Sequence, residues 1–582
     1  MSTTTAPKSS VSSPDLTAGQ TVHRIEIHPL AHAGDPRAHA LIKQAAGIGF
    51  DLEGAHSCKV YLIEADLNDD QLNQIMNNLL CNGVVERAVI GSSEPRGSLV
   101  EIHPLPGVMD PPAQSVSDAI FALVGIRATV TTGDRYDIIG ISDSKAQTLA
   151  HRMLANPVVA GVHAVPFHPT QLPHGHTHDF QLTSVNIRFL SDAELELLSR
   201  EGHLFLALNE MQAIQSHYQS LDREPTDIEL ETLAQTWSEH CVHKTLKSTI
   251  HYTGDNTGEV APDSRPGVTM HDDGSYTINN LLKSTVAAAT FELIEEEIDW
   301  TLSVFVDNAG IIKFDDNHAV CIKVETHNHP SALTEIVGGV RDYGNRMGIP
   351  TINGAVSFDN RYVGNPLVYC GCIGIMPIDL ISGDAAPGDR IIALGGKTGR
   401  DGIHGATFSS AELTDTHADE FSHAVQIGNA IEEKRTLDAI LRARDFEGGP
   451  LYRSITDCGA GGFSSAVGEM GEKVGAFVNL EQAPLKYAGL SYTEIWISEA
   501  QERMVLAVSQ ENLPALQKIC DEEHVELANL GYFGTESQEL ILNFNNTEVG
   551  RLPMSFMHDG IPTPTRTATW TAPKQETTAA KE

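Results

Sequence analysis

An internal repeat near the N-terminus limits the fold of this 582-residue chain more than any other feature. The segment IEIHPL at 25–30 returns as VEIHPL at 100–105, and each copy is followed by a proline-containing turn and a helical pattern. Gly47–Gly49 likewise corresponds to Gly125–Arg127, so the period is about 75 residues. Each copy has the order strand, helix, strands, helix, strand, which predicts two tandem ferredoxin-like units forming a covalent pseudo-dimer. We expect their paired sheets to bury faces that one copy would leave exposed.

The remaining length requires further domains, since a chain of this size divides into about three to five units. Both ends are rich in Ser, Thr, Pro or Ala, which predicts disordered tails. The first twenty residues contain neither an apolar segment nor an arginine, so no secretory or mitochondrial signal is visible. Eight scattered cysteines include no CxxC pair, which is typical of reduced, mostly buried thiols. We therefore expect a cytoplasmic protein.

The charge of the chain limits its partners. It has 39 basic and 77 acidic residues, giving a formal net charge of −38. Such a surface repels nucleic acid and anionic lipid, and no apolar run approaches the roughly 20 residues of a membrane-spanning helix. We therefore expect neither a nucleic-acid nor a membrane partner. An anionic substrate would need Mg2+, helix N-termini and a few well-placed cations.

The segment 171–224 has a mixed pattern that predicts a linker. Its histidines 174, 176 and 178 could bind a metal, but without a regular fold around them a linker is favoured. Pro225 and a capping box from Thr226 to Glu229 then open a helix with apolar residues at helical spacing through Cys241. His240, His243 and Lys244 would share one stripe of that helix. A polar helix end that faces solvent is the alternative.

The segment AVCIKVETHNHP, residues 319–330, predicts a strand that ends at its proline. Alternation places Lys323, Glu325 and His327 on one face of this strand. A carboxylate there can hold Mg2+, a lysine can meet a phosphate, and a histidine can move a proton near neutral pH. An ordinary strand exit is the alternative. A nuclease interpretation of the letters HNH is disfavoured because the three residues are adjacent and the chain is acidic.

Two glycine-rich segments follow. GGKTG at 395–399 lacks the earlier glycine of a phosphate-binding Walker loop, since Ile391 stands in its place, and a plain turn is as good an interpretation. In SITDCGAGGFSS a strand ends at Asp457, glycines follow, and a helix begins near Phe463. A carboxylate, a glycine loop and a helix N-terminus together suit Mg2+ and an anion. Asp457 as a simple helix cap is the alternative.

Taken together, several ordered segments resemble the phosphoribosylformylglycinamidine synthase family, the ATP-dependent amidotransferases of purine biosynthesis. They cover about residues 225–553 and include TWSEHCVHKT, KVETHNHPSA, GVRDYGNRMGIPTINGAVSFD, GGKTGRDGIHGATFSS, AVQIGN, ITDCGAGGFSS and ISEAQERM. The resemblance implies that ATP activates the amide oxygen of formylglycinamide ribonucleotide as an iminophosphate. Ammonia, released from glutamine by a glutaminase partner, then displaces phosphate to give the amidine. The tandem repeat looks like two copies of the family's small accessory subunit.

The resemblance also implies roles for single residues. His240 and His327 match active-site histidines, with His327 as the proton acceptor, and Lys323 and His243 match ATP contacts. Glu325 and Asp457 match Mg2+ ligands. Ala500 stands where many members have serine, which puts a contact through that side chain in doubt. The positions that match substrate contacts are Thr326, His327, Asn328, His329, Gln426, Glu499, Ala500 and Gln501.

Two departures from the family matter. After Ala332 the chain lacks a glycine-rich stretch with an Arg-Asp pair and several dozen further residues, and Arg341-Asp342 belongs to a later segment. The N-terminal domain is therefore expected to be shortened. The chain also ends where the family's first half ends, so a second-half chain, or a second copy of this one, would have to complete the site. No glutaminase signature is evident.

We therefore expect an α+β protein, the first-half subunit of a split ligase. One alternative is a catalytically impaired or regulatory subunit of that complex, because the Arg-Asp segment is missing. Another is a homodimeric ATP-dependent ribonucleotide synthetase. The expected order is a tail (1–20), two ferredoxin-like repeats (21–95 and 96–170), a linker (171–224), an aminoimidazole-ribonucleotide-synthetase-like N-terminal domain (225–378), the matching C-terminal domain (379–555) and a tail (556–582).

Overall fold

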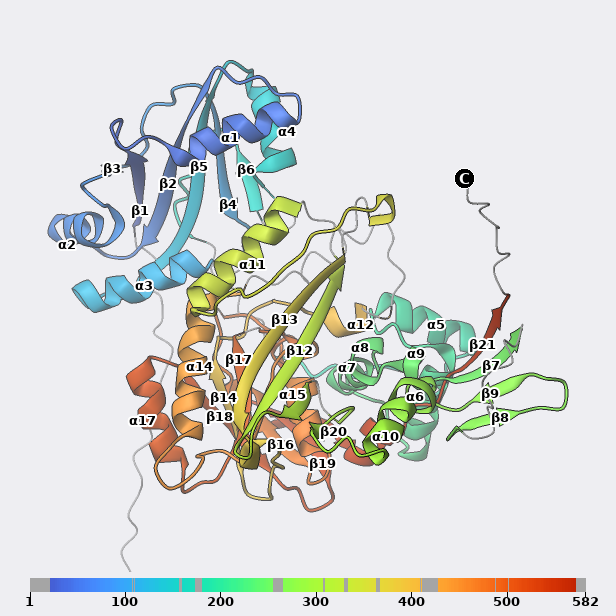
Figure 1. Cartoon of the computed structure of the whole chain (residues 1–582). Coiled ribbons are helices and arrows are strands. Elements are labelled where there is room, and N and C mark those ends of the chain that lie inside the picture. Colours follow the sequence, from blue (N-terminus) through green and yellow to red (C-terminus); the bar gives the residue numbers. More distant parts are fainter. Residues whose placement is uncertain are drawn as a thin grey trace, which may run out of the picture. The chain divides into compact units, whose positions relative to one another are not determined.

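The structure is a computed structural model whose described residues form two compact units, one within residues 1–175 and the other within 176–582 (Figure 1). No helix among the described residues is both long and apolar enough to cross a bilayer. All eight cysteines are free thiols, but only Cys58, Cys458 and Cys520 are buried, so the expectation that most of them are buried is wrong. The described residues are 21–106, 108, 110–155, 160–172, 180–254, 265–306, 309–328, 333–362, 367–408, 410, 428–486, 488–500 and 502–571. The histidines at 174, 176 and 178 lie outside them.

The first unit contains the internal repeat. Strands β2 and β5 begin 75 residues apart, and so do helices α1 and α3. The first copy comprises β1 (Val22–Pro29), α1 (Pro36–Gly47), β2 (Gly54–Glu64), α2 (Asp69–Ile75), the π-helical turn η1 (Met76–Leu80) and β3 (Glu86–Ile90). The second comprises β4 (Ser98–Pro104), α3 (Pro111–Val124), β5 (Thr129–Ile139), α4 (Asp143–Met153) and β6 (Ala160–His163).

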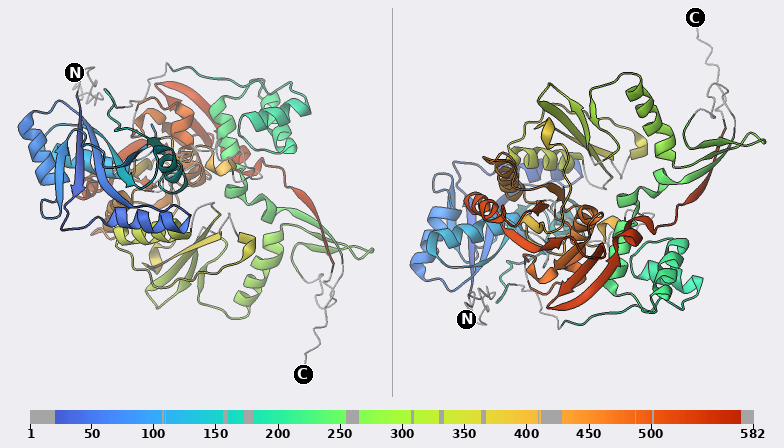
Figure 2. Two further views of the ribbon diagram at one scale, coloured as in Figure 1. Left: turned by 90° about the horizontal axis from the view of Figure 1, so that it is seen from above. Right: turned by 90° about the horizontal axis from the view of Figure 1, so that it is seen from below.

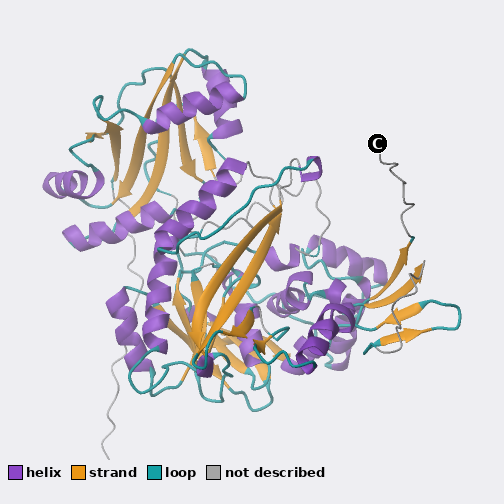
Figure 3. Cartoon of the chain, viewed as in Figure 1, coloured by secondary structure: helices purple, strands orange, loops and turns teal. Residues whose placement is uncertain are grey.

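All six strands form one antiparallel sheet in the order β3-β1-β2-β5-β4-β6 (Figure 3). The copies join edge to edge through the β2–β5 pair, which runs in register from Gly54↔Ile139 to Glu64↔Thr129. Each copy supplies three strands, whereas a ferredoxin-like unit has four. Among the described residues one strand, instead of two, separates the two helices of each copy. The repeat is therefore present, but the ferredoxin-like assignment of each copy is not confirmed.

The hydrophobic cores of this unit mix the two copies. One core contains Leu41 and Ala45 of α1 together with Leu149 and Ala150 of α4. A second core joins α2 and η1 of the first copy to Ile120 of α3. Since each core takes a helix from each copy, neither copy buries its apolar helix faces alone.

The second unit begins with helices. They are α5 (Asp192–Glu201), α6 (Leu208–Ser220), α7 (Asp227–Thr236), α8 (Glu239–Val242) and α9 (Lys244–Lys247). The expected linker thus contains two packed helices, and Met211, Ile214 and Tyr218 of α6 are fully buried in the main core. The sequence predicted a linker but not its helices, because the mixed pattern hid short amphipathic helices that tertiary packing stabilises.

The single helix predicted from Thr226 to Lys244 is also wrong in detail. The predicted capping box at Thr226 is present, but α7 ends at Thr236. Ser238 then caps α8 by accepting a hydrogen bond from the Cys241 amide at 3.1 Å. His243 has a left-handed conformation, with φ of 52°, between α8 and α9. His240, His243 and Lys244 therefore do not share one helical stripe.

A four-stranded antiparallel sheet of order β10-β11-β12-β13 carries the predicted KVETHN strand. Its strands are β10 (Thr301–Ser303), β11 (Gly310–Lys313), β12 (His318–Asn328) and β13 (Leu367–Pro377). The neighbouring helical segments are η3 (Lys283–Ala287), α10 (Ala288–Glu295), α11 (Leu333–Met347), η4 (Asn360–Tyr362) and η5 (Ile378–Leu380). The shortened junction after Ala332 thus leads directly into helix α11.

A seven-stranded sheet of order β15-β17-β14-β18-β16-β19-β20 forms the largest part of this unit. Residues of the central strand β14 alternate between two cores, Ile391 and Ala393 in one and Ile392 and Leu394 in the other. Helices α7, α15 and α16 pack into the first core and α14 and α17 into the second, so both faces of the sheet are covered.

Its strands are β14 (Arg390–Gly395), β15 (Ser454–Asp457), β16 (Ala476–Asn479), β17 (Arg503–Val508), β18 (Leu527–Phe533), β19 (Glu539–Phe544) and β20 (Thr547–Pro553). Its helices are α12 (Gly405–Phe408), α14 (Ala430–Arg444), α15 (Gly462–Gly471), η7 (Leu480–Gln482), α16 (Tyr492–Ile497), α17 (Leu513–Glu523) and α18 (Met554–Asp559).

A small sheet of order β21-β7-β9-β8 completes the second unit and projects from it (Figure 2). It joins β7 (Thr249–Gly254), β8 (Val268–Met270) and β9 (Tyr276–Ile278) to the late strand β21 (Thr565–Trp570). Strand β21 lies parallel to β7, so a late segment of the chain packs beside the residues that follow α9.

Candidate functional site

The strand β12 presents Lys323 and Glu325 on one face, as the alternation predicts. It pairs in continuous antiparallel register with β13 from His318↔Pro377 to Asn328↔Leu367. Lys323 Nζ lies 2.7 Å from Glu325 Oε1, and both side chains remain partly accessible to solvent. A cation and a carboxylate are therefore held side by side near the strand end, within reach of a bound ligand.

His240 of α8 brings the predicted groups together. His240 is exposed to solvent on one side. Nearby protein atoms displace water from the rest of the ring, and this partial desolvation lowers its pKa. Glu325 and Asp457 act in the opposite direction and raise the pKa of His240, whereas His243 and Lys323 lower it. Four residues from three separate segments thus act electrostatically on one imidazole. The lowered pKa keeps that ring neutral and able to accept a proton near pH 7.

Asp457 lies where the sequence predicts it, at the end of β15. Its Oδ1 accepts a hydrogen bond from the Gly459 amide at 2.9 Å, and the carboxylate is exposed. The glycine loop then turns through Gly461, with φ of 84°, into helix α15, which starts at Gly462. A side chain at Gly461 would meet Ser465 Oγ at 2.2 Å, so glycine is required there. The strand, the carboxylate and the helix N-terminus therefore have the predicted order.

Glu499 and Ala500 lie against the same glycine loop. The Gly461 amide donates to Glu499 Oε1 at 3.4 Å, and the Ala500 amide donates to the Cys458 carbonyl at 3.1 Å. Glu499 is 7% exposed, and its burial raises the pKa of the carboxyl to about 8. It is consequently protonated at neutral pH and can donate a hydrogen bond. Ala500 is buried, so its methyl group is not available at the surface.

The other predicted residues are described in part or not at all. Thr326 is exposed near the end of β12, and the backbones of His327 and Asn328 complete that strand. The side chains of His327 and Asn328 lie outside the described structure, and so do residues His329, Gln426 and Gln501. Their proposed roles stay predictions.

Arg503 is a positioning residue that the sequence did not reveal. Its guanidinium is buried, with the central carbon 3.9 Å from the ring centroid of Phe463. It donates to Thr398 Oγ1 and to the Ser498 carbonyl, each at 2.5 Å. Arg503 thereby ties the GGKTG loop to the segment that carries Glu499 and to the first turn of α15. An arginine beginning the apolar strand RMVLAV was the available signal.

The donor set at this site fits Mg2+. Glu325 and Asp457 offer carboxylate oxygens, which magnesium prefers, and both are accessible to solvent. Both carboxylates raise the pKa of His240, so each lies within electrostatic range of that ring. Magnesium keeps several waters and takes only one or two protein carboxylates together with substrate phosphates. Two exposed carboxylates, of which Glu325 pairs with Lys323, match that requirement.

A second group of metal-ligand types lies in the first unit but does not suit a cation. Glu26, His28 and Cys58 bring ligand atoms within 4.8 Å of one another. Glu26 Oε1, however, already pairs with Arg24 at 2.7 Å and Arg135 at 2.9 Å. Two buried guanidinium groups repel a metal ion, and burial raises the pKa of the Cys58 thiol, which keeps it protonated. This group is a structural charge network.

Comparisons with known proteins bear on the second unit. Residues 189–244 match the family model for the formylglycinamide ribonucleotide amidotransferase linker domain. Residues 329–376 match the N-terminal domain of AIR synthase related proteins, and residues 386–542 match the C-terminal domain of the same group. Phosphoribosylformylglycinamidine synthase subunit PurL of Thermoplasma acidophilum is 31% identical over 431 residues, covering 65% of this chain and 51% of that protein.

The chain is homologous to the synthetase subunit of phosphoribosylformylglycinamidine synthase. Its PurL relative from Staphylococcus aureus is 33% identical over 305 residues, covering 44% of this chain and 41% of the relative. A solved structure, Thermotoga maritima PurL complexed with FGAR, matches with a TM-score of 0.46 and 25% identity, covering 60% of this chain and 56% of the other. The chain spans about half the length of the two Thermoplasma PurL relatives that it matches. The resemblance to PurL, the mixed α/β class and the AIR-synthase-related domains are thus confirmed.

Proposed function

We propose that this chain is a first-half subunit of an ATP-dependent C–N ligase of purine biosynthesis. The reaction converts formylglycinamide ribonucleotide and ammonia to formylglycinamidine ribonucleotide. ATP transfers its terminal phosphoryl group to the amide oxygen, ammonia adds to the activated carbon, and phosphate leaves. The observation that carries this proposal is the Lys323–Glu325 pair on β12, together with the effect of His243, Lys323, Glu325 and Asp457 on the pKa of His240. These are the residues that the resemblance assigns to ATP, Mg2+ and proton transfer.

Each group has a physical role in that reaction. Lys323 binds an ATP phosphate, because its ammonium lies at an accessible strand face. Glu325 and Asp457 would hold Mg2+, which neutralises phosphate charge when bound. His240, neutral because its pKa is lowered, is placed to accept a proton, and His327 is the second proton acceptor. Protonated Glu499 donates a hydrogen bond to the ribonucleotide, with Thr326, Asn328, His329, Gln426, Ala500 and Gln501 as further substrate contacts.

A second-half synthetase chain completes the enzyme, and a glutaminase supplies ammonia. Support for the first comes from an exposed apolar face on β12 and β13. Ile322 and Val324 are 40% and 57% exposed, and Ile373 and Ile375, on the neighbouring strand, are 56% and 61% exposed. Ile322 and Ile373 are direct cross-strand partners. Exposing such an apolar face to water is unfavourable. We propose that the second-half chain packs against it.

The two N-terminal repeats serve as fused copies of the small accessory subunit. Support comes from the shared helix–sheet cores and from the β2–β5 seam, which joins the copies as two subunits of a dimer would be joined. We propose that each copy derives from a ferredoxin-like unit. At the seam, β2 of the first copy and β5 of the second each cover the sheet edge of the other copy. The complex as a whole is proposed to act in the cytoplasm.

The decisive experiment measures ADP release with formylglycinamide ribonucleotide, ATP, Mg2+ and ammonium, with and without a second-half chain. Activity is expected only in the mixture. Within the mixture, Glu325→Gln and Asp457→Asn should each lower the rate by at least about a hundredfold, since each removes a metal ligand. Glu447→Gln, an exposed carboxylate after α14, is the matched control. Full activity of both site variants would refute the magnesium assignment.

The alternatives predict other outcomes of the same assay. An impaired or regulatory subunit follows from the shortened segment after Ala332, and it would give no ADP with any second half. A homodimeric ribonucleotide synthetase would turn over alone and sediment as a dimer. The exposed face on β12 and β13 is compatible with self-pairing, so sedimentation of the chain alone separates this case from the split enzyme.

A further inference from the structure

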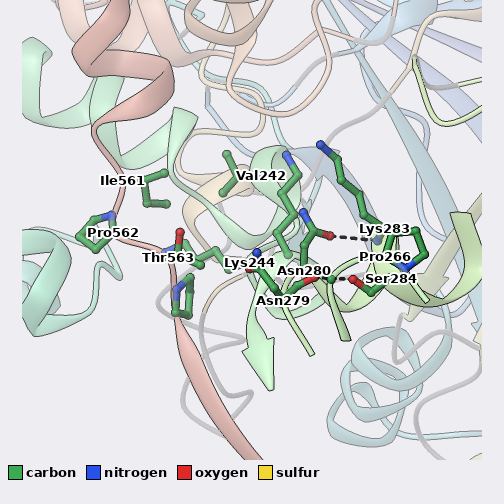
Figure 4. Close-up of a pocket in the computed structure, with 13 residues that line it drawn as sticks. Val242, Lys244, Pro266, Asn279, Asn280, Lys283, Ser284, Ile561, Pro562 and Thr563 are labelled. Atoms are coloured by element: carbon green, nitrogen blue, oxygen red, sulfur yellow. Dashed lines mark hydrogen bonds between the residues drawn. The ribbon is translucent and has the colours of Figure 1, made fainter. Parts of the chain in front are cut away.

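A cavity of about 460 Å³ lies in the second unit beside helix α9 (Figure 4). Four separate segments form its walls. They are the α8–α9 region around Lys244, the residues before β8 and after β9, and the segment Ile561–Pro564 that leads into β21. Its volume falls within the range of roughly 300 to 1,000 Å³ that is typical of small-molecule pockets.

Backbone hydrogen bonds hold these walls in place. The Thr249 amide donates to the Pro564 carbonyl at 2.9 Å, which fixes the late segment beside the end of α9. The Leu281 amide donates to the Ser248 carbonyl at 3.2 Å, and the Asn279 amide donates to the Gly267 carbonyl at 2.8 Å. The cavity is therefore preformed, which reduces the entropy that a ligand would lose by ordering it.

The charge of the lining is opposite to that of the chain. Lys244, Lys247 and Lys283 line the cavity, and no Asp or Glu is among the described residues that line it, although the chain has a net charge of −38. Lys244 is buried and pairs with Glu210 at 2.8 Å. Lys247 and Lys283 are exposed and have no acidic partner within the described part of the chain. Two uncompensated ammonium groups at a concave wall create a local positive potential that attracts anions.

The remaining lining residues divide into polar and apolar groups. Asn279, Asn280 and Ser284 supply hydrogen-bonding groups on the lysine side. Ile561 and Pro562 form an apolar wall opposite them (Figure 4). We propose that this cavity binds a phosphorylated small molecule, with its phosphate held by Lys247 and Lys283 and its organic part against Ile561 and Pro562.

This site is separate from the candidate ligase site. None of the described residues assigned to ATP, Mg2+ or the ribonucleotide lines the cavity. Val242 and Lys244, which do line it, flank His243 in the sequence, so the two sites share the short α8–α9 segment. The proposal goes beyond the ligase function and can be tested by binding alone.

The test is calorimetric titration of the full chain with inorganic pyrophosphate, in magnesium-free buffer at about 0.1 M salt. Saturable binding to one site is expected. The informative variant is Asn280→Asp, which places a carboxylate in the cavity. Asn280 has φ of 57°, and its Oδ1 accepts a hydrogen bond from the Lys283 amide at 3.0 Å. Aspartate tolerates that conformation and can accept the same bond, so the fold is expected to persist.

Asn280→Asp adds a negative charge beside the anion and Lys283→Gln removes a positive one. Each should therefore weaken pyrophosphate binding by about tenfold or more. The matched control is Asn546→Asp, at an exposed asparagine with φ of 61° in the β19–β20 turn. This control and Glu325→Gln should leave the affinity unchanged. An absence of binding overturns the proposal. Equal weakening by Asn280→Asp and Asn546→Asp also overturns it, since the anion would then respond only to net charge.

Discussion

His240 is the residue whose ionisation reports most directly on the candidate site. Its pKa is lowered by desolvation, raised by Glu325 and Asp457, and lowered by Lys323. We therefore expect Glu325→Gln and Asp457→Asn each to move the titration midpoint of His240 to lower pH. Lys323→Gln should move it to higher pH, because a like charge is removed. NMR titration of labelled histidine, assigned with His240→Gln, measures these shifts.

Asp521, an exposed residue of helix α17, offers a control for that titration. Asp521→Asn removes the same charge from another element and should leave the pKa of His240 unchanged. The signs matter more than the sizes, because exposed charges are screened by salt. A downward shift for Lys323→Gln, or no response to either carboxylate variant, would mean that these residues do not meet at His240.

Glu499 links a residue of the site to the pH dependence of stability. Burial raises its pKa to about 8, against about 4.3 in an unfolded chain. Between these values the folded protein holds a proton that the unfolded chain has lost, so this contribution to stability decreases as pH rises. Glu499→Gln stays neutral and removes the dependence. Its free energy of unfolding should therefore gain on that of the parent from pH 5 to pH 8, by at most about 1.4 kcal/mol per pH unit, with a matching relative rise in melting temperature.

Glu447→Gln, at an exposed carboxylate, should show no such widening gap in the same melting series. A constant difference between Glu499→Gln and the parent across pH would show that Glu499 is ionised in the folded protein. That result would also remove its proposed role as a hydrogen-bond donor to the substrate.

Sequence patterns located some site residues and missed others for a physical reason. Lys323 and Glu325 were found because strand alternation is local, and Asp457 because a strand end, glycines and a helix start follow one another in the chain. The burial that protonates Glu499, and the contacts of Arg503 with Thr398 and Phe463, depend on segments far apart in sequence. No periodicity encodes such tertiary contacts.

At the scale of elements, the break between α8 and α9 makes a testable prediction. His243 has φ of 52°, a conformation that costs a non-glycine residue roughly 1–2 kcal/mol. His243→Gly should therefore be more stable than His243→Ala by about 1 kcal/mol, although both lack the imidazole. Thermal or urea unfolding of the two variants measures the difference.

A matched pair at Val242 should behave in the opposite way. Val242 lies within helix α8, where glycine is less favourable than alanine by about 1 kcal/mol. Equal stability of His243→Ala and His243→Gly would mean that position 243 is not in a left-handed turn. A continuous helix would then place His240, His243 and Lys244 on one stripe.

The elements also show where sequence analysis succeeded and failed. The repeat predicted the order of helices and strands in the first unit, because each copy encodes its own hydrophobic pattern. It did not predict that α1 packs with α4, or that β2 and β5 join the copies edge to edge. Helices α5 and α6 were missed because their apolar faces become informative only once packed against the main core.

At the scale of the whole molecule, the sheet from β10 to β13 leaves β13 as an edge strand among the described residues. The chain spans about half the length of its two Thermoplasma PurL relatives. The proposed second-half partner follows from the family resemblance, which does not identify the surface that this partner would cover. That surface appears only when the cross-strand partners of β12 and β13 are known.

Replacing Ile373 and Ile375 by lysine should therefore disrupt the complex with a second-half chain. Both side chains are more than half exposed, so the substitutions should leave the fold of the free chain intact. Burial of each isoleucine in an interface contributes about 1.5–3 kcal/mol, so the double variant should raise Kd roughly a hundredfold or more. Sedimentation or calorimetry of the mixed chains measures this. Ile352→Lys, at a residue 79% exposed outside the sheet, is the matched control. If the double variant binds as tightly as the parent, the apolar face is not the interface, and the second half must bind elsewhere on this chain.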